Sequence, residues 1–363
     1  MLRLPRLSGL AALAAFFVAA SPALADDGFA LIGPLRVRDL SPLSLFRLDM
    51  PPAHAINSIK SGWGIELTYS QANLFLVSDE VHAYLEQRPT NGPVTEAEAR
   101  ELLARPAEVF FFDAEMTILS ATIGRALNEH WQVMVTVPYN WYGGGVLDEV
   151  VEQFHDAVGL RDAGRVHVPR DRVQVFARLG ENQRIVLTDE VESGPGDVVG
   201  TVRYQRQLAP AWHGILEGAV RFPTGERHLY FSKTNSDFGV QASVQHQRGN
   251  AGYYASLSYI FVADNPFFPG VSDTPTLSLA AERRILNDHT AALAQMTWSS
   301  GTADGLEHSD LTEDRMQISF GLRHRSVNPP YTASIALTEN VVHYKNTPDI
   351  GIHFGMAWIF PDR

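Results

Sequence analysis

The stretch NSDFGVQASVQHQ, residues 235–247, alternates apolar and polar positions with a period of two. One face collects Phe238, Val240, Ala242 and Val244, and the other collects Asp237, Gln241, Ser243 and Gln245. Successive side chains of a β-strand point to opposite faces, so this pattern predicts a strand with one dry and one wet side. The tight turn RGNA follows, and AGYYASLSYIFV, residues 251–262, repeats the alternation.

The same alternation recurs along the chain in about twelve segments. The predicted strands cover residues 62–75, 109–125, 131–141, 196–207, 213–222, 235–246, 251–262, 275–285, 290–300, 312–326, 331–343 and 350–360. Tight turns (LNEH, LAPAW, RGNA, LNDH and SVNPP) alternate with longer connections at 76–108, 142–195, 223–234, 263–274, 301–311 and 344–349.

Alternating short turns and long loops is typical of outer-membrane barrels, whose periplasmic turns are short. A β-sandwich has no reason for that regularity. We therefore predict an all-β fold for residues 62–363, a transmembrane antiparallel up-and-down barrel of about 12 strands. Both ends of such an even-stranded barrel would lie on the periplasmic side. A soluble secreted β-protein is the alternative.

The N-terminal region reads as two segments. Basic MLRLPRLSG, apolar LAALAAFFVAA and SPALA predict a secretory signal peptide over residues 1–25. Residues 26–61 are rich in proline and contain no obvious element, so they either hang in the periplasm or fold into the lumen. Loss of Arg3 and Arg6 with the signal peptide makes the chain two charges more negative than its full-length −12. Such an acidic chain is a poor partner for nucleic acid.

Aromatic residues gather near the ends of the predicted strands, as in the interfacial girdles of membrane barrels. They are Trp63, Trp131, Tyr139, Trp141, Tyr142, Trp212, Phe222, Trp298, Tyr331, Trp358 and Phe360. Phe360 resembles the aromatic C-terminus of proteins that the barrel-assembly machinery inserts, although three residues follow it. The expected partners are therefore this machinery, outer-membrane lipids and lipopolysaccharide.

Two loops carry helical signals. Thr95 and Glu98 form a T-x-x-E capping pattern that opens a helix over residues 94–105. In the loop 142–195, apolar residues recur at helical spacing and predict a helix over residues 145–158, followed by a hairpin of residues 173–180 and 183–188. The helix has one apolar face, Val146, Leu147, Val150, Val151, Phe154 and Val158, and an acidic face, Asp148, Glu149, Glu152 and Asp156. The apolar face would be buried at the barrel mouth, against the hairpin or at the lipid interface.

This loop is predicted to be the extracellular lid or plug of the barrel, with Phe154, His155, Asp156, Arg165 and Arg170 as its main side chains. His155 and Asp156 are neighbours on a helix and point about 100° apart, so they cannot act as a base and its orienting acid. No nucleophile elbow, metal-ligand spacing or cofactor motif accompanies them, and we predict no enzyme and no cofactor.

The arginines of the loop have two sets of candidate partners. Arg161, Arg165 and Arg170 would pair with Asp156, Asp162 and Asp171, or with lipopolysaccharide phosphates.

The wet faces of the strands carry both signs of charge and are predicted to line the lumen. Their members are Glu66, Asp113, Glu115, Asp197, Arg203, Gln205, Glu217, Arg221, Asp237, Gln241, Glu282, Arg315, Gln317, Arg323 and His353. Opposed charges could orient a permeating solute, or they could pair and seal the interior. Eight strands leave a filled interior and sixteen an aqueous channel, so about twelve does not decide between these.

The predicted function is a narrow or gated channel for a small solute, which could be apolar or aromatic. A closed barrel with a structural or surface-binding role is the alternative. A lipid-acting enzyme is the third hypothesis, and it would need a serine–histidine pair on the lipid-facing surface.

The chain resembles a known family. FHDAVGLRDAGRVHVPR, which follows WYGGGVLDEVVEQ, is similar to the most recognisable block of domain-of-unknown-function family 3187, a family of Gram-negative outer-membrane β-barrels. GDVVGTVRYQRQL and AVRFPTGER resemble that family, barrels grouped with a phenol-degradation family and, more distantly, hydrophobic-compound channels. KTNSDFG departs from the glycine-rich run expected there. The resemblance implies a barrel fold and an outer-membrane location. Because the family has no assigned activity, the resemblance gives no indication of function.

Overall fold

The computed structural model describes residues 32–41, 43–53, 61–89, 91–158, 164–180, 182–188, 192–225, 232–265, 270–287, 289–301, 309–342, 347–348 and 350–362. The predicted signal peptide lies outside the described residues. No helix among the described residues is long and apolar enough to cross a membrane.

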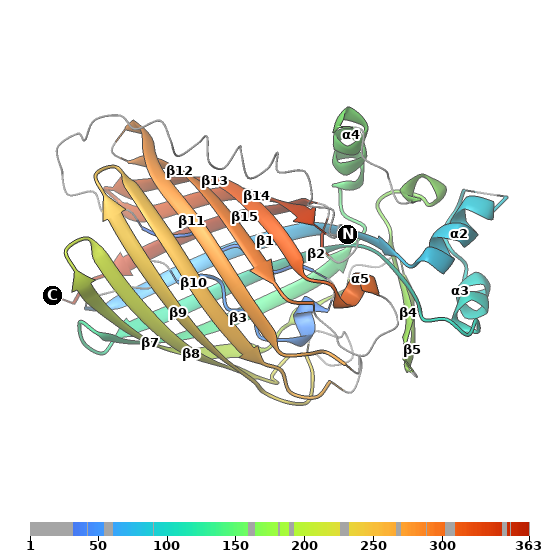
Figure 1. Ribbon diagram of the computed structural model, residues 1–363, viewed down its shortest axis with the longest axis horizontal. Coiled ribbons are helices and arrows are strands. Elements are labelled where there is room, and N and C mark those ends of the chain that lie inside the picture. The colour runs from blue at the N-terminus through green and yellow to red at the C-terminus, as the bar shows by residue number, and fades with distance from the viewer. Residues whose placement is uncertain are drawn as a thin grey trace, which may run out of the picture.

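Twelve antiparallel strands close into a barrel, confirming the predicted fold class (Figure 1). Strand β1 pairs with β15 from Trp63↔Phe360 to Asn73↔Ile350, and this ladder closes the wall. The strands are β1 (Trp63–Val77), β2 (Val109–Ala126), β3 (Trp131–Gly143), β7 (Val198–Ala209), β8 (Trp212–Phe222), β9 (Asp237–Arg248), β10 (Ala251–Phe261), β11 (Thr274–Asn287), β12 (Thr290–Ser299), β13 (Arg315–Val327), β14 (Pro330–Val342) and β15 (Ile350–Phe360).

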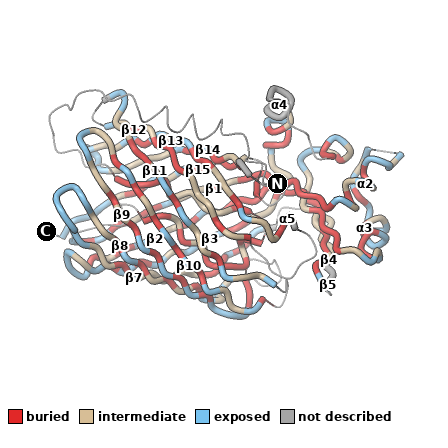
Figure 2. Tube along the Cα trace, viewed as in Figure 1, coloured by how far each residue is buried: buried red, intermediate tan, exposed pale blue. Residues whose placement is uncertain are grey.

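Exposed and buried residues alternate along these strands, and the apolar residues are the exposed ones (Figure 2). On β9, Phe238 and Val240 are exposed while Asp237 and Gln241 are buried. A soluble barrel would show the reverse, so the outer surface is the one that faces lipid.

Exposed aromatic residues mark both edges of the apolar band. Trp63, Trp131, Trp212 and Phe360 lie at the end with the short turns, and Tyr139, Phe222, Phe238 and Phe261 lie at the other. On β8, Trp212 and Phe222 are ten residues apart. In a strand tilted by about 40°, this separation spans about 25 Å along the barrel axis. This height matches the apolar band of an outer-membrane barrel.

Several strands continue beyond the extracellular edge of the band (Figure 1). β4 (Val173–Leu179) pairs with the start of β2, β5 (Asn182–Thr188) pairs with β4, and β6 (Glu192–Pro195) pairs with β3. The predicted hairpin is therefore present as β4 and β5, but it extends the barrel wall and is not a separate loop structure. β3 and β4 pair with successive stretches of β2 and run in the same direction, so β4 prolongs β3. Residues 144–172 form an insertion between these two strands.

Helices α2 (Asp79–Gln87) and α3 (Glu96–Leu103) pack on this extension and bury Val81, Leu85 and Leu102 against Phe111 and Phe176. The second helix is the predicted one. The first was not predicted, because only Val81 and Leu85 of its nine residues are buried and the apolar stripe is too short to detect.

The capping box of α3 is confirmed. The Glu98 amide donates to Thr95 Oγ1 at 3.3 Å, and the Thr95 amide donates to Glu98 Oε2 at 2.7 Å. Burial acts to raise the pKa of Glu98, but hydrogen bonds from Thr95 and Tyr84 together with the charge of Arg88 outweigh it and hold that pKa below its usual range. The carboxylate is therefore charged at neutral pH and stabilises the first turn of the helix.

If the outer surface faces lipid, the cost of placing a charge on it should depend strongly on how deep in the membrane the position lies. Leu257→Arg, in the middle of β10, should lower the free energy of unfolding in lipid vesicles by roughly 2–4 kcal/mol. Leu286→Arg, at the short-turn end of β11, is the matched control and should change it by about 0–1 kcal/mol. Urea titration of the two variants measures both values, and equal losses would contradict the assignment.

Candidate functional site

The barrel interior is occupied by the chain's own N-terminal region, residues 32–41 and 43–53, which we call the lumenal strap (Figure 1). The Ile32 and Gly33 amides donate to Glu282 Oε2 at 3.0 and 2.9 Å. The Leu35 amide donates to Gln295 Oε1 at 2.9 Å. These hydrogen bonds hold the first leg of the strap to β11 and β12.

The strap turns near the extracellular end, at a short helix η1 (Ser44–Phe46). There Arg221 Nη2 donates to the Leu45 carbonyl at 2.6 Å, and the Leu48 amide donates to Asp237 Oδ2 at 2.8 Å. Arg315 Nη1 contacts Asp39 Oδ2 at 3.1 Å.

The second leg returns along β9. The Ala53 amide donates to Gln241 Oε1 at 3.0 Å, and Gln241 Nε2 donates to the Met50 carbonyl at 3.0 Å. Gln245 Nε2 donates to the Ala53 carbonyl at 3.2 Å, near the short-turn end of β9. The strap is thus a hairpin with both legs toward the periplasmic end and its tip toward the outside.

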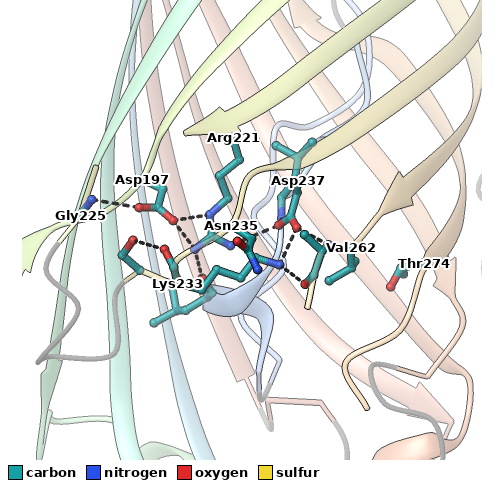
Figure 3. Close-up of polar contacts among 12 residues, drawn as sticks. Asp197, Arg221, Gly225, Lys233, Asn235, Asp237, Val262 and Thr274 are labelled. Atoms are coloured by element: carbon teal, nitrogen blue, oxygen red, sulfur yellow. Dashed lines mark hydrogen bonds and ion pairs between the residues drawn. The ribbon is translucent and has the colours of Figure 1, made fainter. Parts of the chain in front are cut away.

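A buried charge cluster holds the wall near the tip (Figure 3). Arg221 Nη2 lies 2.6 Å from Asp197 Oδ2, and Arg221 Nη1 lies 3.6 Å from Asp237 Oδ2. Lys233 Nζ lies 2.5 Å from Asp237 Oδ1 and also donates to the Ala263 carbonyl at 2.7 Å. Two cations therefore face two carboxylates, which offsets the cost of burying each charge.

Other charged residues of the interior pair with neighbouring strands or with the strap. Arg203 Nη2 lies 2.5 Å from Glu217 Oε1 on the adjacent strand. Arg323 Nη1 lies 2.8 Å from Glu282 Oε1 and donates to the Gly33 carbonyl at 2.7 Å. From the sequence, the charged residues of the lumen either form free rows of opposed charge or pair with one another. The described contacts match pairing more closely.

Nine of the predicted lumen residues lie on the inner side of the barrel: Glu66, Asp197, Arg203, Glu217, Arg221, Asp237, Glu282, Arg315 and Arg323. Gln205, Gln241, Gln317 and His353 share that side. The prediction of Asp113 and Glu115 as lumen-lining residues was wrong. Glu115 is in register with Asn73, and Asp113 with Phe75, on the face that carries Trp63 and Leu67 outward.

Asp113 and Glu115 are buried because the insertion 144–172 covers them on the outer wall. Glu115 Oε1 accepts from the Val146 amide at 2.7 Å and also from the Leu147 amide. Above the aromatic girdle the outer face no longer meets lipid, so its side chains can be polar. At this height, a polar residue of a strand therefore need not face the lumen.

The insertion includes α4 (Asp148–Val158), close to the predicted helix. Arg165 pairs with Asp148 and donates to Asn73 Oδ1 at 2.7 Å, and Arg170 Nε donates to Glu152 Oε2 at 3.0 Å. The described partners of these two arginines are thus Asp148 and Glu152, other acidic residues of the same loop than those named from the sequence, and pairing with Asp156 or Asp162 stays a prediction.

Arg161, Asp162 and the side chains of Phe154, His155 and Asp156 lie outside the described residues. The described part of the insertion lies beside the barrel, while the strap occupies the interior. The described contacts of the insertion are with the outer wall, and its role as a lid stays a prediction.

The strap leaves little free space. Two hollows of about 40 and 30 Å³ remain between it and the wall, and both are lined by Arg36, Glu66 and Thr68. Each has room for only a few water molecules. Around these two hollows, the described residues of the strap therefore fill the interior.

One serine–histidine contact exists at the inner wall. His353 Nδ1 lies 2.9 Å from Ser70 Oγ, and His353 Nε2 lies 3.0 Å from Thr338 Oγ1. This pair faces the interior and not lipid, and its other neighbour is a hydroxyl rather than an orienting carboxylate. Within the ranges that the structure describes, no group of three or more His, Cys, Asp or Glu residues could hold a metal ion.

Comparison with known proteins identifies the family. The family model described as "Protein of unknown function (DUF3187)" matches residues 95–360. The chain belongs to the DUF3187 family. The resemblance carried by the 141–170 block is thereby confirmed, and no curated protein sequence matches this DUF3187 protein.

Solved structures similar to this DUF3187 protein are outer-membrane barrels. The COG4313 outer membrane channel from Pseudomonas putida F1 is 13% identical with a TM-score of 0.51, and the match covers 83% of this chain and 96% of that one. The NanC porin is 8% identical with a TM-score of 0.42, covering 82% and 100%. A Pseudomonas aeruginosa FadL homologue is 10% identical with a TM-score of 0.40, covering 90% and 98%. At 13% identity, the likeness to the COG4313 channel shows the fold alone.

The contacts of the strap predict that Arg323 holds its first leg against the wall. Arg323→Ala removes an ion pair with Glu282 and hydrogen bonds to the Gly33 and Pro34 carbonyls, at 2.7 and 2.9 Å. Breaking a buried pair of this kind costs roughly 3–5 kcal/mol. Amide hydrogen exchange of residues 32–41 should therefore accelerate, whereas Arg206→Ala, at an exposed position of β7, should leave it unchanged. Unchanged exchange in Arg323→Ala would mean that the strap is held by other contacts.

Proposed function

We propose that this DUF3187 protein is an outer-membrane channel for a small solute, with the lumenal strap as its gate. The observation that carries the proposal is the way in which the strap is held. Its backbone bonds to wall side chains such as Glu282, Gln241 and Asp237 and does not join the strand ladder. The strap can therefore move without breaking the backbone hydrogen bonds that close the barrel.

Glycines in the wall make room for each leg. A Cβ at Gly239 would lie 2.5 Å from Met50 Sδ. A Cβ at Gly321 would lie 2.6 Å from the Ile335 carbonyl oxygen of the adjacent strand and 3.0 Å from Leu35 Cδ2. Both glycines sit on the inward face between exposed residues. The wall is thus shaped to accept the strap closely while holding it only through side-chain contacts.

An apolar cluster beneath the tip supports a solute with apolar character. Leu40, Leu43 and Phe46 of the strap are buried against the inner wall of the extracellular half, where Leu74, Leu76, Phe110, Met116 and Ile118 belong to the same cluster. When the tip withdraws, these wall residues become an apolar site facing the mouth. Small apolar or aromatic molecules would bind there by burying the same surface.

Disulfide locking tests the gate. The chain contains no cysteine, so an introduced pair can only bond to itself. Met50→Cys with Gly239→Cys, and Leu35→Cys with Gly321→Cys, would tie one leg each to the wall. Uptake of phenol into proteoliposomes should fall to the level of empty vesicles on oxidation and return on reduction.

The cysteine-free protein is the control and should take up phenol equally under both conditions. Equal uptake by the locked and reduced variants would show that the strap is not the gate. Uptake no greater than in empty vesicles for every protein would favour the alternative, a closed barrel with a structural or surface-binding role.

The apolar site predicts a selectivity change. Ile118→Ser places a hydroxyl in the inner-wall cluster and should reduce phenol uptake while leaving arabinose uptake unchanged. Ile123→Ser is the matched control, because Ile123 is exposed on the outer face of the same strand. If both variants transport phenol as the parent protein does, the cluster is not the solute site.

A further inference from the structure

The outward face of five neighbouring strands, β7 to β11, carries charge of one sign. Most outward side chains of these strands are apolar or aromatic. Among their described outward residues, the only Arg, Lys, Asp or Glu residues are Arg206, Arg248 and Arg283, and all three lie in the half of the strand that leads to the short turn. This margin of the wall is therefore locally basic, in a chain whose net charge is −12.

Two of these arginines flank a gap in the outer surface. Strands β9, β10 and β11 lie side by side (Figure 1), and Ala251 of β10 is in register with Arg248 on one side and with Arg283 on the other. Two strand spacings separate the Cα atoms of the arginines by about 10 Å. The methyl group of Ala251 fills little of the space between two such long side chains. A phosphate group fits there and can accept hydrogen bonds from both guanidinium groups.

The charges beside the gap have no acidic partner of their own. In the part of the chain that the structure describes, Arg248 and Arg283 form no ion pair and no side-chain hydrogen bond. Arg125, the outward arginine at the same margin of β2, differs, because its Nη1 lies 2.7 Å from Asp362 Oδ1. The gap thus holds two cations that the described residues do not neutralise, and charge complementarity assigns it to an anion.

The gap lies where the headgroups of the membrane begin. Trp212, His246 and Tyr253 are in register, and the ring of His246 stacks on both neighbours with centroids 4.3 and 6.4 Å away. Such rings mark the membrane interface. Arg248 lies two residues beyond His246, a rise of about 5 Å, and the headgroup layer is about 5–7 Å thick. β11 continues for four residues beyond Arg283, so this arginine starts nearer the membrane centre, and its long side chain extends toward the headgroups.

An apolar surface continues from the gap toward the membrane centre. On the same outward face, Leu257 of β10 and Leu279 of β11 are 58% and 39% exposed. Acyl chains would cover these leucines, whereas a free phosphate ion would contact the gap alone. A molecule that joins a phosphate to acyl chains therefore matches both parts of the surface.

We propose that Arg248 and Arg283, with Ala251 between them, bind the headgroup of an anionic phospholipid from the inner leaflet. Its phosphate lies between the two guanidinium groups, and its acyl chains lie along Leu257 and Leu279. The site belongs to the membrane-spanning wall and is independent of the proposed channel function.

Native mass spectrometry of the full-length protein tests this site. The protein is released from micelles that contain equal amounts of phosphatidylglycerol and phosphatidylcholine, and the retained lipid is identified. We expect the parent protein to retain phosphatidylglycerol in preference to phosphatidylcholine. Arg248→Gln and Arg283→Gln should each weaken this binding about fivefold, as expected for one cation lost at a membrane surface. A parent protein without this preference would overturn the proposal.

Two further variants separate a built site from general attraction to a basic margin. Ala251→Leu keeps both charges but fills the gap, and it should weaken the binding as much as the loss of one arginine. Arg206→Gln is the matched control, because Arg206 faces outward on β7 in register with Gly214 rather than beside a second arginine. It should leave the binding unchanged. A heat-dependent shift in gel mobility identifies the variants whose barrel is intact.

Equal losses from all three arginine variants, or unchanged binding in Ala251→Leu, would overturn the site, because the charge of the whole margin would then suffice. Full displacement of the lipid by inorganic phosphate would also overturn it, since the acyl chains would then contribute nothing.

Discussion

The structure depends on the requirement that every backbone polar group within a membrane be paired. The β1–β15 ladder meets it by closing the wall, and closure puts apolar side chains outside and polar side chains inside. Those inner side chains then need partners of their own, because unpaired buried charge is costly. A twelve-stranded wall lies between the eight strands that enclose a filled interior and the sixteen that enclose a channel, and here the strap occupies the interior. The lumenal strap supplies backbone amides and carbonyls, which hydrogen-bond to Glu282, Gln241 and Arg221.

Under the proposed gating, the contacts that fill the lumen are also the ones that let it open. Strand pairing is cooperative and belongs to the wall, whereas each leg of the strap is held by individual side-chain contacts and by packing against Gly239 and Gly321. The tip covers an apolar part of the wall, so its movement would exchange strap leucines for a solute of similar character. At its extracellular edge the outer wall is covered by the insertion. There Asp113 and Glu115 lie on the outward face of β2 but are buried, and Glu115 accepts a hydrogen bond from the insertion.

Much of the fold follows from local pattern. Period-two alternation locates the twelve wall strands to within a few residues, and the T-x-x-E signal locates α3, because both depend on neighbours in sequence. Asp113 and Glu115 were misplaced because alternation shows which residues share a face but not which face is inward. Leu119 and Ile123 share their face on the same strand and are exposed to the outside. The lumenal strap could not be placed, since single hydrogen bonds between residues about 190–290 positions apart leave no periodic trace. The one available signal was the glycine at inward positions 239 and 321.

The central claim is that the strap fills the lumen and can withdraw from it. Pulsed electron paramagnetic resonance measures this directly, with spin labels at Leu45 on the tip and Thr290 at the short-turn end of β12. Without solute we expect a single narrow, long distance, and with saturating phenol a second, shorter population as the tip moves toward the periplasmic end. A single distance that phenol leaves unchanged would contradict the gate, and a broad distribution without solute would contradict the filled lumen itself.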